Sequence, residues 1–349
     1  MGSCVSAVDT VHVHKKNDHA SAKGSASTDS KPFSPRPTQA VATGQSADLS
    51  RKRFDRESTS VSQRKPKFVY NEHNRRYHNE EDTPYVLPND DDEITRLQEF
   101  HYLTRWGLDG DFQAPVKDLL EKGAKVLDIG CGPGTWVLEM ATEFPESHFT
   151  GIDISPVFPE TIRPSNCEFK EVNALKGLPF PDNHFDFVYE RYLELGYTTE
   201  NWRFVLGEIK RVTKPGGWVQ LVEMDGRPRS AGPLFKEMLE TSIAALEKRH
   251  LDVTIGKNLS SLLEQCSDDS STMFVDFRSI PVSHGGRLGD MWAHQIRVGF
   301  AGLLALFEPK WGKMTQDEFK TRIDAAVNEC VEYKSYINFY FGYIQVVKA

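Results

Sequence analysis

A short glycine-rich segment between two apolar runs constrains this chain more than any other feature. Residues 125–129 are typical of a buried strand. Gly130, Gly132 and Gly134 then follow at a spacing of two, before a helical pattern that reaches about residue 143. Glycine is needed where φ must be positive or where a ligand approaches the backbone closely. The segment therefore predicts a strand, a tight turn against a ligand, and a helix.

Two acidic residues indicate the kind of ligand. Asp128 lies just before the turn, where its carboxylate would repel a pyrophosphate. The glycine spacing also differs from a dinucleotide-binding fingerprint, in which the third glycine comes one residue later. Asp153 ends the next predicted strand, at a position where acids bind ribose hydroxyls. The pattern predicts a nucleoside with a cationic tail, which S-adenosyl-L-methionine fits. The alternatives are a dehydrogenase, which the glycine spacing disfavours, and a turn whose glycines serve packing alone.

Strands and helices alternate after this segment. A helix is predicted over 202–212, and further strands are predicted near residues 148–152, 167–172, 185–189 and 218–223. This alternation predicts a parallel α/β sheet with helices on both faces. The cofactor half is expected at about 115–225, a helical lid or acceptor insertion at about 227–335, and C-terminal strands at about 336–347.

Composition separates residues 1–85 from the rest of the chain. Residues 1–65 contain 12 serines and no Trp, Tyr or Ile, so they cannot bury enough apolar area to offset the entropy of ordering. We therefore expect a disordered tail over 1–85 and a folded domain over 86–349. Residues beyond 93 hold the whole net charge of −8, which disfavours nucleic acid as a partner. Five widely spaced cysteines favour a reducing, intracellular compartment and no metal site.

The motifs at 126–136, 151–155, 173–180, 185–191 and 211–223 resemble, in this order, those of class I S-adenosylmethionine-dependent methyltransferases. The resemblance covers roughly residues 120–225 and implies a Rossmann-like sheet, S-adenosyl-L-methionine as cofactor, and methyl transfer by in-line displacement. The residues that it implies for cofactor binding are Asp128, Gly130, Cys131, Gly132, Gly134, Asp153, Ile154, Asn173, Ala174, Glu190 and Arg191. Asn173 departs from the family's usual Asp beside the adenine amine, and its amide oxygen is expected to accept that hydrogen bond instead.

A second, shorter resemblance begins at Tyr85. The run 85–93, followed by Arg96, Leu97 and His101, looks like the first helix of fungal methyltransferases akin to the global regulators of secondary metabolism. This resemblance implies an alternative function, a non-catalytic or weakly catalytic regulator that keeps the fold and acts through protein partners. His101 is expected to be a hydrogen-bonded residue on the face of this helix.

The methyl acceptor is left open by these motifs. Displacement at a sulfonium needs alignment first, and a base only when the acceptor keeps its proton. The candidate catalytic residues on the acceptor side are Glu190 and Tyr192 at the end of the fourth strand and His294 in the insertion. For Glu190 the alternative is a helix cap or an ion pair, and for His294 and Trp292 it is packing of a lid helix.

The predicted tail carries two competing address signals. Gly2 with Ser6 fits the pattern for N-myristoylation, and Cys4 is available for palmitate, which together predict peripheral membrane contact in the cytoplasm. Basic residues at 52–53 and 64–67 have the spacing of a bipartite nuclear-import signal. The sequence does not choose between the two, and an ordinary basic patch is the alternative to import.

Overall fold

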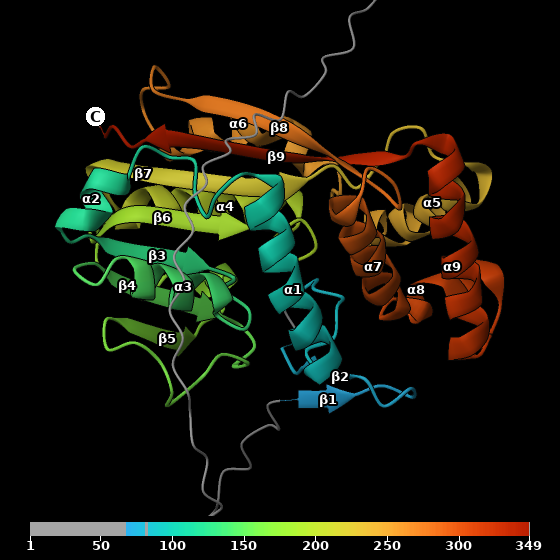
Figure 1. Ribbon diagram of the computed structural model, residues 1–349. Helices are drawn as coiled ribbons and strands as arrows, with labels where there is room; N and C mark the ends of the chain where they lie inside the picture. Colours follow the sequence, from blue (N-terminus) through green and yellow to red (C-terminus); the bar gives the residue numbers. More distant parts are fainter. Residues whose placement is uncertain (1–67, 81–82, 349) are drawn as a thin grey trace, which may run out of the picture. The chain divides into compact units, whose positions relative to one another are not determined.

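Seven strands form one sheet at the centre of the folded domain (Figure 1). The computed structural model describes residues 68–80 and 83–348. The strand order is β5 (Cys167–Glu171), β4 (His148–Asp153), β3 (Lys125–Ile129), β6 (Phe185–Arg191), β7 (Thr213–Met224), β9 (Tyr336–Gln345) and β8 (Phe274–Pro281). The first five strands are mutually parallel, whereas β9 runs antiparallel to both β7 and β8. The prediction of a Rossmann-like α/β sheet is confirmed.

The two faces of the sheet bury separate apolar clusters, because side chains alternate along each strand. In β3, Val126 belongs to one cluster, whereas Leu127 and Ile129 belong to the other. The helices that contribute to the first face are α1 (Asp91–Gly107), α2 (Lys117–Lys122) and α3 (Thr135–Glu143), and those of the second are α4 (Thr199–Val212) and α6 (Leu259–Leu263). Helices thus cover both faces, as the alternation predicts.

Most of the predicted insertion is helical, and it continues into the first apolar cluster. Its longer helices are α5 (Pro233–Glu247), α7 (Arg287–Ala301), α8 (Leu304–Trp311) and α9 (Gln316–Tyr333). Three short turns of 3-10 helix are η1 (Ala174–Lys176), η2 (Ile255–Asn258) and η3 (Glu264–Cys266). The expected helical insertion also contains a strand that the sequence analysis did not predict, because residues 274–281 form β8. This edge strand leaves many side chains exposed, so it lacks the apolar run that marks a buried strand.

The C-terminal strands predicted on either side of Gly342 are in fact one strand, β9. Gly342 pairs in register with Leu221 of β7 and Val275 of β8. A Cβ atom at Gly342 would lie 2.8 Å from the carbonyl oxygen of Phe274 and 2.9 Å from Leu263. The glycine therefore allows a close approach inside a continuous strand and does not interrupt it.

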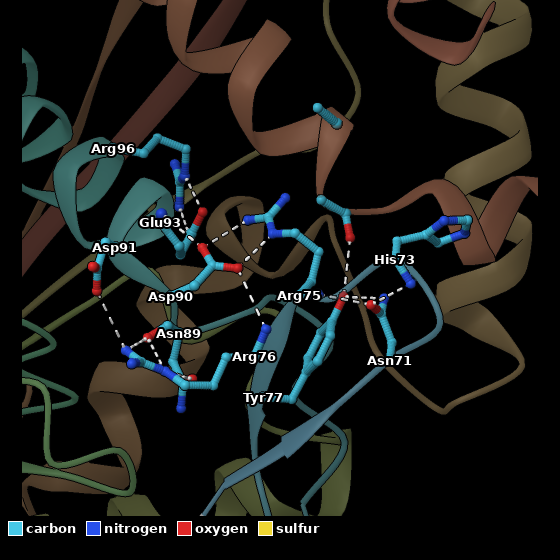
Figure 2. A network of polar contacts seen from close by, with 12 residues as sticks. Asn71, His73, Arg75, Arg76, Tyr77, Asn89, Asp90, Asp91, Glu93 and Arg96 are labelled. Carbon is cyan, nitrogen blue, oxygen red and sulfur yellow. Dashed lines mark hydrogen bonds and ion pairs between the residues drawn. The ribbon is translucent and has the colours of Figure 1, made fainter. Parts of the chain in front are cut away.

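A hairpin lies inside the segment predicted to be tail. Its two strands are β1 (Phe68–Tyr70) and β2 (Arg76–His78), which pair antiparallel. Figure 2 shows the contacts that dock it. Arg75 Nη2 donates to Asp90 Oδ1 at 3.0 Å at the N-cap of α1, and Arg76 Nε donates to Asn89 Oδ1 at 3.1 Å. The predicted tail boundary at residue 85 is thus too late, because these two arginines anchor the hairpin to the folded domain.

The predicted address signals are not described by the structure. Gly2, Cys4 and the basic segments at 52–53 and 64–67 lie outside the described residues, so acylation and nuclear import stay predictions. Among the helices of residues 68–80 and 83–348, none has the length and apolar character needed to span a bilayer.

Candidate active site

A cavity of about 160 Å³ lies at the C-terminal ends of β3, β4 and β6. After β3 the chain adds β4 and β5 on one side of that strand, and it then crosses to add β6 on the other side. Open α/β sheets bind ligands at the point between two such neighbouring strands. Eight of the predicted cofactor-binding residues line this cavity, namely Gly130, Cys131, Gly132, Asp153, Ile154, Asn173, Ala174 and Arg191. Helix α1 and the segment before it complete the wall with Tyr85, Asn89, Leu97 and His101. We call this space the nucleoside cavity.

Asp153 holds the glycine loop against the sheet. The N–H of Gly132 donates to Asp153 Oδ2 at 2.8 Å, and the N–H of Ser155 donates to Oδ1 at 2.8 Å. Burial raises the pKa of Asp153, and the backbone hydrogen bonds oppose this rise. Gly130 and Gly132 have φ angles of +68° and +52°, which glycine adopts without strain. Asp153 therefore fixes the loop while its carboxylate keeps further acceptor capacity on the cavity wall.

Gly134 has a different role from the other two glycines. It is the N-cap of α3 with a φ of +77°, and it is not among the residues that line the nucleoside cavity. A Cβ atom there would lie 2.5 Å from the ring of Phe169. The predicted cofactor residue Gly134 is thus a packing position, which the regular glycine spacing alone does not reveal.

A buried charge pair lies at the base of the loop. Asp128 is buried outside the cavity lining, and burial raises its pKa to about 7. The nearby Arg191 guanidinium opposes that rise, whereas Asp153 adds to it. Burial and then Arg191 lower the pKa of His101 to about 4, so its ring is neutral at pH 7. Its Nδ1 lies 3.4 Å from Arg191 Nη1 and its Nε2 lies 2.8 Å from Glu139, as expected for a hydrogen-bonded helix residue.

His101 also belongs to a compact charged cluster with Asp111 and Glu139. Their ligand-type atoms all lie within 4.8 Å of one another. Arg105 Nε lies 3.2 Å from Asp111 Oδ2, and its Nη1 lies 2.9 Å from Glu139 Oε2. A guanidinium thus supplies the positive charge that the two carboxylates need, and we assign this cluster to ion pairing.

Asn173 presents its amide differently from the expectation. Its Oδ1 accepts a hydrogen bond from the N–H of Leu175 at 3.0 Å and so caps the turn η1. Its Nδ2 is buried and makes no close hydrogen bond among the described residues, although the Asn173 amide interacts with the Glu80 carboxylate and helps to lower its pKa. The free group of Asn173 is therefore a donor, which suits a ring nitrogen of adenine better than the adenine amine.

Glu190 is not among the residues that line the nucleoside cavity, although its neighbours Arg191 and Tyr197 are. Its side chain is fully buried, and neither carboxyl oxygen has a hydrogen-bond partner within the described part of the chain. A negative charge on Glu190 helps to raise the pKa of Tyr197 and that of Cys266, and both residues belong to the apolar cluster on the α4 and α6 face. Burial, helped by the charge of Asp128, raises the pKa of Glu190 to about 8. Among the described residues the structure gives Glu190 no ion pair, and its role as a cofactor contact stays a prediction.

The remaining acceptor-side candidates fall into different environments. Tyr192 lines the nucleoside cavity at the end of β6, and its hydroxyl lies 2.8 Å from Thr104 Oγ1. His294 lies on the surface of α7 with Nε2 3.2 Å from Glu99 Oε2, away from this cavity. Trp292 is buried against Phe100 and Phe339, with ring centroids 5.6 Å and 5.1 Å apart. The structure therefore brings Tyr192, but not His294, to the predicted site.

Two buried acids escaped the sequence analysis as site residues. Glu194 follows β6 and Glu223 lies in β7, where it accepts a hydrogen bond from the N–H of Leu193 at 2.9 Å. Burial, and then the charge and hydrogen bond of Glu194, raise the pKa of Glu223 well above its ordinary value. Glu223 therefore holds the proton of the pair. An acid inside the apolar strand 218–224 was the signal that could have found it.

Comparison with known proteins gives the family. Residues 126–217 match the family described as methyltransferase domain. N-methyltransferase verN of Clonostachys rogersoniana is 36% identical over 153 residues, 43% of this chain and 53% of the relative. Methyltransferase str2 of Strobilurus tenacellus is 31% identical over 205 residues, 58% of this chain and 72% of the relative. Secondary metabolism regulator laeA of Aspergillus fumigatus is 30% identical over 164 residues, 46% of this chain and 42% of the relative.

The fold is a Rossmann-like α/β sheet with a cavity at the C-terminal ends of its strands, and the relatives narrow the class of protein. The chain spans about half the length of verN and somewhat less of laeA, but nearly three quarters of str2. This chain belongs to the methyltransferase family, with relatives among fungal methyltransferases.

Proposed function

We propose that this protein binds S-adenosyl-L-methionine in the nucleoside cavity and catalyses transfer of its methyl group to an acceptor. The observation that carries the proposal is Asp153, which ends β4 on the cavity wall and is tied to the glycine loop through Gly132. In nucleotide-binding sheets an acid at this position accepts hydrogen bonds from ribose hydroxyls. Membership of the methyltransferase family supports the same cofactor.

The other residues of the cavity fit the remaining parts of this cofactor. Asn173 Nδ2 can donate to the adenine ring, and the positive loop φ angles let the backbone approach the ligand closely. Arg191 would bind the methionine carboxylate, His101 would orient its guanidinium through Nδ1, and Asp128 would balance the cationic end through space. When bound, S-adenosyl-L-methionine supplies a methyl group activated by the sulfonium. The residues of this chain then serve to hold and align it, which can account for roughly 7–11 kcal/mol of a barrier.

Calorimetric titration of the full chain tests this proposal. S-adenosyl-L-methionine and S-adenosylhomocysteine should bind with micromolar affinity, and NAD should not bind. Binding of NAD alone would mean that the loop accepts a pyrophosphate. Failure of a folded sample to bind either sulfur nucleoside would contradict the proposed function.

Asp153→Ala should weaken the binding of S-adenosyl-L-methionine by at least tenfold. The substitution removes the ribose acceptor and also the acceptor that holds the N–H of Gly132, so both the ligand and the loop lose a charge-assisted hydrogen bond, each worth about 1.5–3 kcal/mol. Isothermal titration gives the affinity, and circular dichroism verifies the fold. The exposed Asp118→Ala on α2 is the matched control and should bind like the wild type. Unchanged affinity in Asp153→Ala would remove Asp153 from the site.

Binding of S-adenosyl-L-methionine should strengthen as pH rises from 5.5 to 7. Asp128 has a pKa raised to about 7 in the free protein, and a cationic ligand favours its carboxylate. The complex therefore lowers this pKa and releases a proton, so affinity increases by up to about tenfold per pH unit below pH 7 and then levels off. The increase of affinity with pH should be smaller for S-adenosylhomocysteine, which lacks the sulfonium. In Asp128→Asn the affinity for S-adenosyl-L-methionine should be nearly independent of pH. Equal slopes in the wild type and Asp128→Asn would contradict this role.

The alternative function, a regulator acting through protein partners, is favoured by the similarity to laeA. A regulator that keeps the fold would also bind the cofactor, so cofactor affinity does not separate the two functions. They differ in whether the chain provides a site for an acceptor next to the transferred methyl group.

A further inference from the structure

A second cavity, of about 180 Å³, lies beside the nucleoside cavity and is lined mostly by apolar side chains of α1, α5 and α7. Its larger apolar residues are Phe100, Phe235, Leu239, Trp292 and Ile296. An apolar cavity of about 150 Å³ is enough to bind benzene. The second cavity therefore has room for a one-ring molecule with a short substituent.

The two cavities share a wall. Tyr85, Leu97 and Tyr192 line both of them. Tyr192 is fixed in place by the contact of its hydroxyl with Thr104 and by a left-handed backbone with φ of +57° at the end of β6. The two cavities therefore adjoin at these three side chains.

Two polar groups of the second cavity have no internal partner. Glu194 Oε2 and Trp292 Nε1 are both buried and make no hydrogen bond within residues 68–80 and 83–348. Buried polar atoms normally have a partner, so both atoms are suited to a ligand. Burial raises the pKa of both acids, but the hydrogen bond between them lowers that of Glu194 and raises that of Glu223, so the free Glu194 oxygen is the one suited to accept a hydrogen bond.

The one guanidinium among the lining residues is already neutralised. Arg96 donates to Glu93 Oε2 from Nε at 2.8 Å and to Oε1 from Nη2 at 2.6 Å, and its Nη1 donates to Gln295 Oε1 at 3.3 Å (Figure 2 shows the pair with Glu93). An anionic ligand would have to compete with Glu93 for this cation. The cavity thus favours a neutral, apolar ligand with one hydrogen-bond donor.

We propose that the second cavity is the methyl-acceptor site and that the acceptor is an apolar small molecule with one hydroxyl or amine, which donates a hydrogen bond to Glu194. This inference rests on the proposed function. It places the acceptor in a cavity whose walls are mostly apolar side chains of α1, α5 and α7.

The transfer then balances in atoms and charge. The lone pair of the acceptor oxygen or nitrogen forms the bond to the methyl carbon, the carbon–sulfur bond breaks, and its electron pair stays on sulfur as S-adenosylhomocysteine forms. The acceptor's proton passes to the Glu194 carboxylate, which releases it later to solvent. The positive charge of the sulfonium and the negative charge of Glu194 are thereby both removed.

Three matched probes test the proposal on the full chain saturated with S-adenosylhomocysteine, namely 4-ethylphenol, 4-ethylaniline and ethylbenzene. We expect 4-ethylphenol or 4-ethylaniline to bind about tenfold more tightly than ethylbenzene, because only these donate to the buried carboxylate. Glu194→Leu should reduce this preference to about twofold or less. Equal affinity of the wild type for all three probes would overturn the role of Glu194.

Filling the cavity tests its location independently. Ser242 lies on the cavity wall in α5, and Ser242→Phe should abolish binding of every probe while leaving S-adenosylhomocysteine affinity unchanged. Ala244→Phe, on the exposed side of the same helix, is the matched control and should bind the probes normally. Probe binding that survives Ser242→Phe would overturn the assignment of the cavity. Failure of the wild type to bind S-adenosylhomocysteine would instead contradict the proposed function.

Proximity to the methyl group decides the acceptor role. With S-adenosyl-L-methionine labelled with ¹³C in the methyl group, an isotope-edited nuclear Overhauser effect should connect the methyl protons to the ring protons of the bound probe. Its absence for a probe that binds, and that Ser242→Phe excludes, would show a cavity that is not the acceptor site.

Discussion

Gly134→Ala should lower the free energy of unfolding by about 2–5 kcal/mol. The φ of +77° at this residue costs an L side chain about 1–2 kcal/mol, and a Cβ atom 2.5 Å from the Phe169 ring forces overpacking that costs about 1–3 kcal/mol. Phe169 is itself stacked on Phe158 with ring centroids 5.1 Å apart, so its ring has little room to move. Urea unfolding followed by circular dichroism measures the change.

Gly132→Ala is the matched control, because it changes the same loop in the same way. Its φ of +52° carries a similar strain, but the nearest atom to an added Cβ is Leu97 Cδ1 at 3.6 Å, an ordinary contact. We expect a loss of only about 1–2 kcal/mol in stability and a large loss of cofactor affinity, since Gly132 lines the nucleoside cavity. Equal destabilisation by the two substitutions would contradict the division of the loop into a packing glycine and a binding glycine.

Glu190→Gln should stabilise the protein, and increasingly so as pH rises. The carboxyl group is buried without a partner among the described residues, and burial raises its pKa to about 8. The folded state therefore keeps a proton that the unfolded state releases above its ordinary pKa near 4.5, so the wild type loses stability as pH rises from about 4.5 to 8. A shift of this size corresponds to about 4 kcal/mol at pH 8 and about 5 kcal/mol well above it, and glutamine avoids this loss because an amide stays neutral.

Urea unfolding of the wild type and Glu190→Gln at pH 5, 6, 7 and 8 measures this effect. The difference in the free energy of unfolding should be small at pH 5 and grow with each step. A difference that stays constant over this range would show that Glu190 does not titrate with a raised pKa, and a destabilised variant would point to a partner for its carboxylate. Because Glu190 lies outside the nucleoside cavity lining, cofactor affinity should change little.

Several parts of the site could be predicted from the sequence because they depend on local geometry. Asp153 and the glycines follow directly from a strand that ends in a turn, so their positions along the chain determine their positions at the sheet edge. The donor at Asn173 could not be predicted, because the N–H of Leu175 occupies its oxygen only once the turn η1 has formed. The burial of Glu190 also depends on the fold, since period two along β6 turns its side chain to the face opposite Tyr189.

Elements without a strong local signal depended on partners elsewhere in the chain. The strands of the β1–β2 hairpin have only three residues each and leave Val69 and Tyr70 exposed, so the hairpin is held by Arg75 and Arg76 on the residues that begin α1. The edge strand β8 exists because β9 offers it a hydrogen-bonding edge. The residues that hold these elements are not part of the short segments themselves. The sequence pattern therefore placed the hairpin in the tail and β8 in a helical insertion.

The sequence by itself determined the α/β class, the order of motifs along the sheet and the acids of the cofactor loop. These features depend on hydrophobic periodicity, on the backbone freedom of glycine and on side-chain charge, which are properties of a few neighbouring residues. Only the tertiary structure decided where the second cavity lies and which groups it leaves without partners. Phe100, Phe235 and Trp292 are separated by more than fifty residues at each step and meet only when α1, α5 and α7 pack together. Glu194 becomes a candidate hydrogen-bond acceptor for a ligand because this packing buries one of its carboxyl oxygens. That oxygen has no hydrogen-bond partner among the described residues.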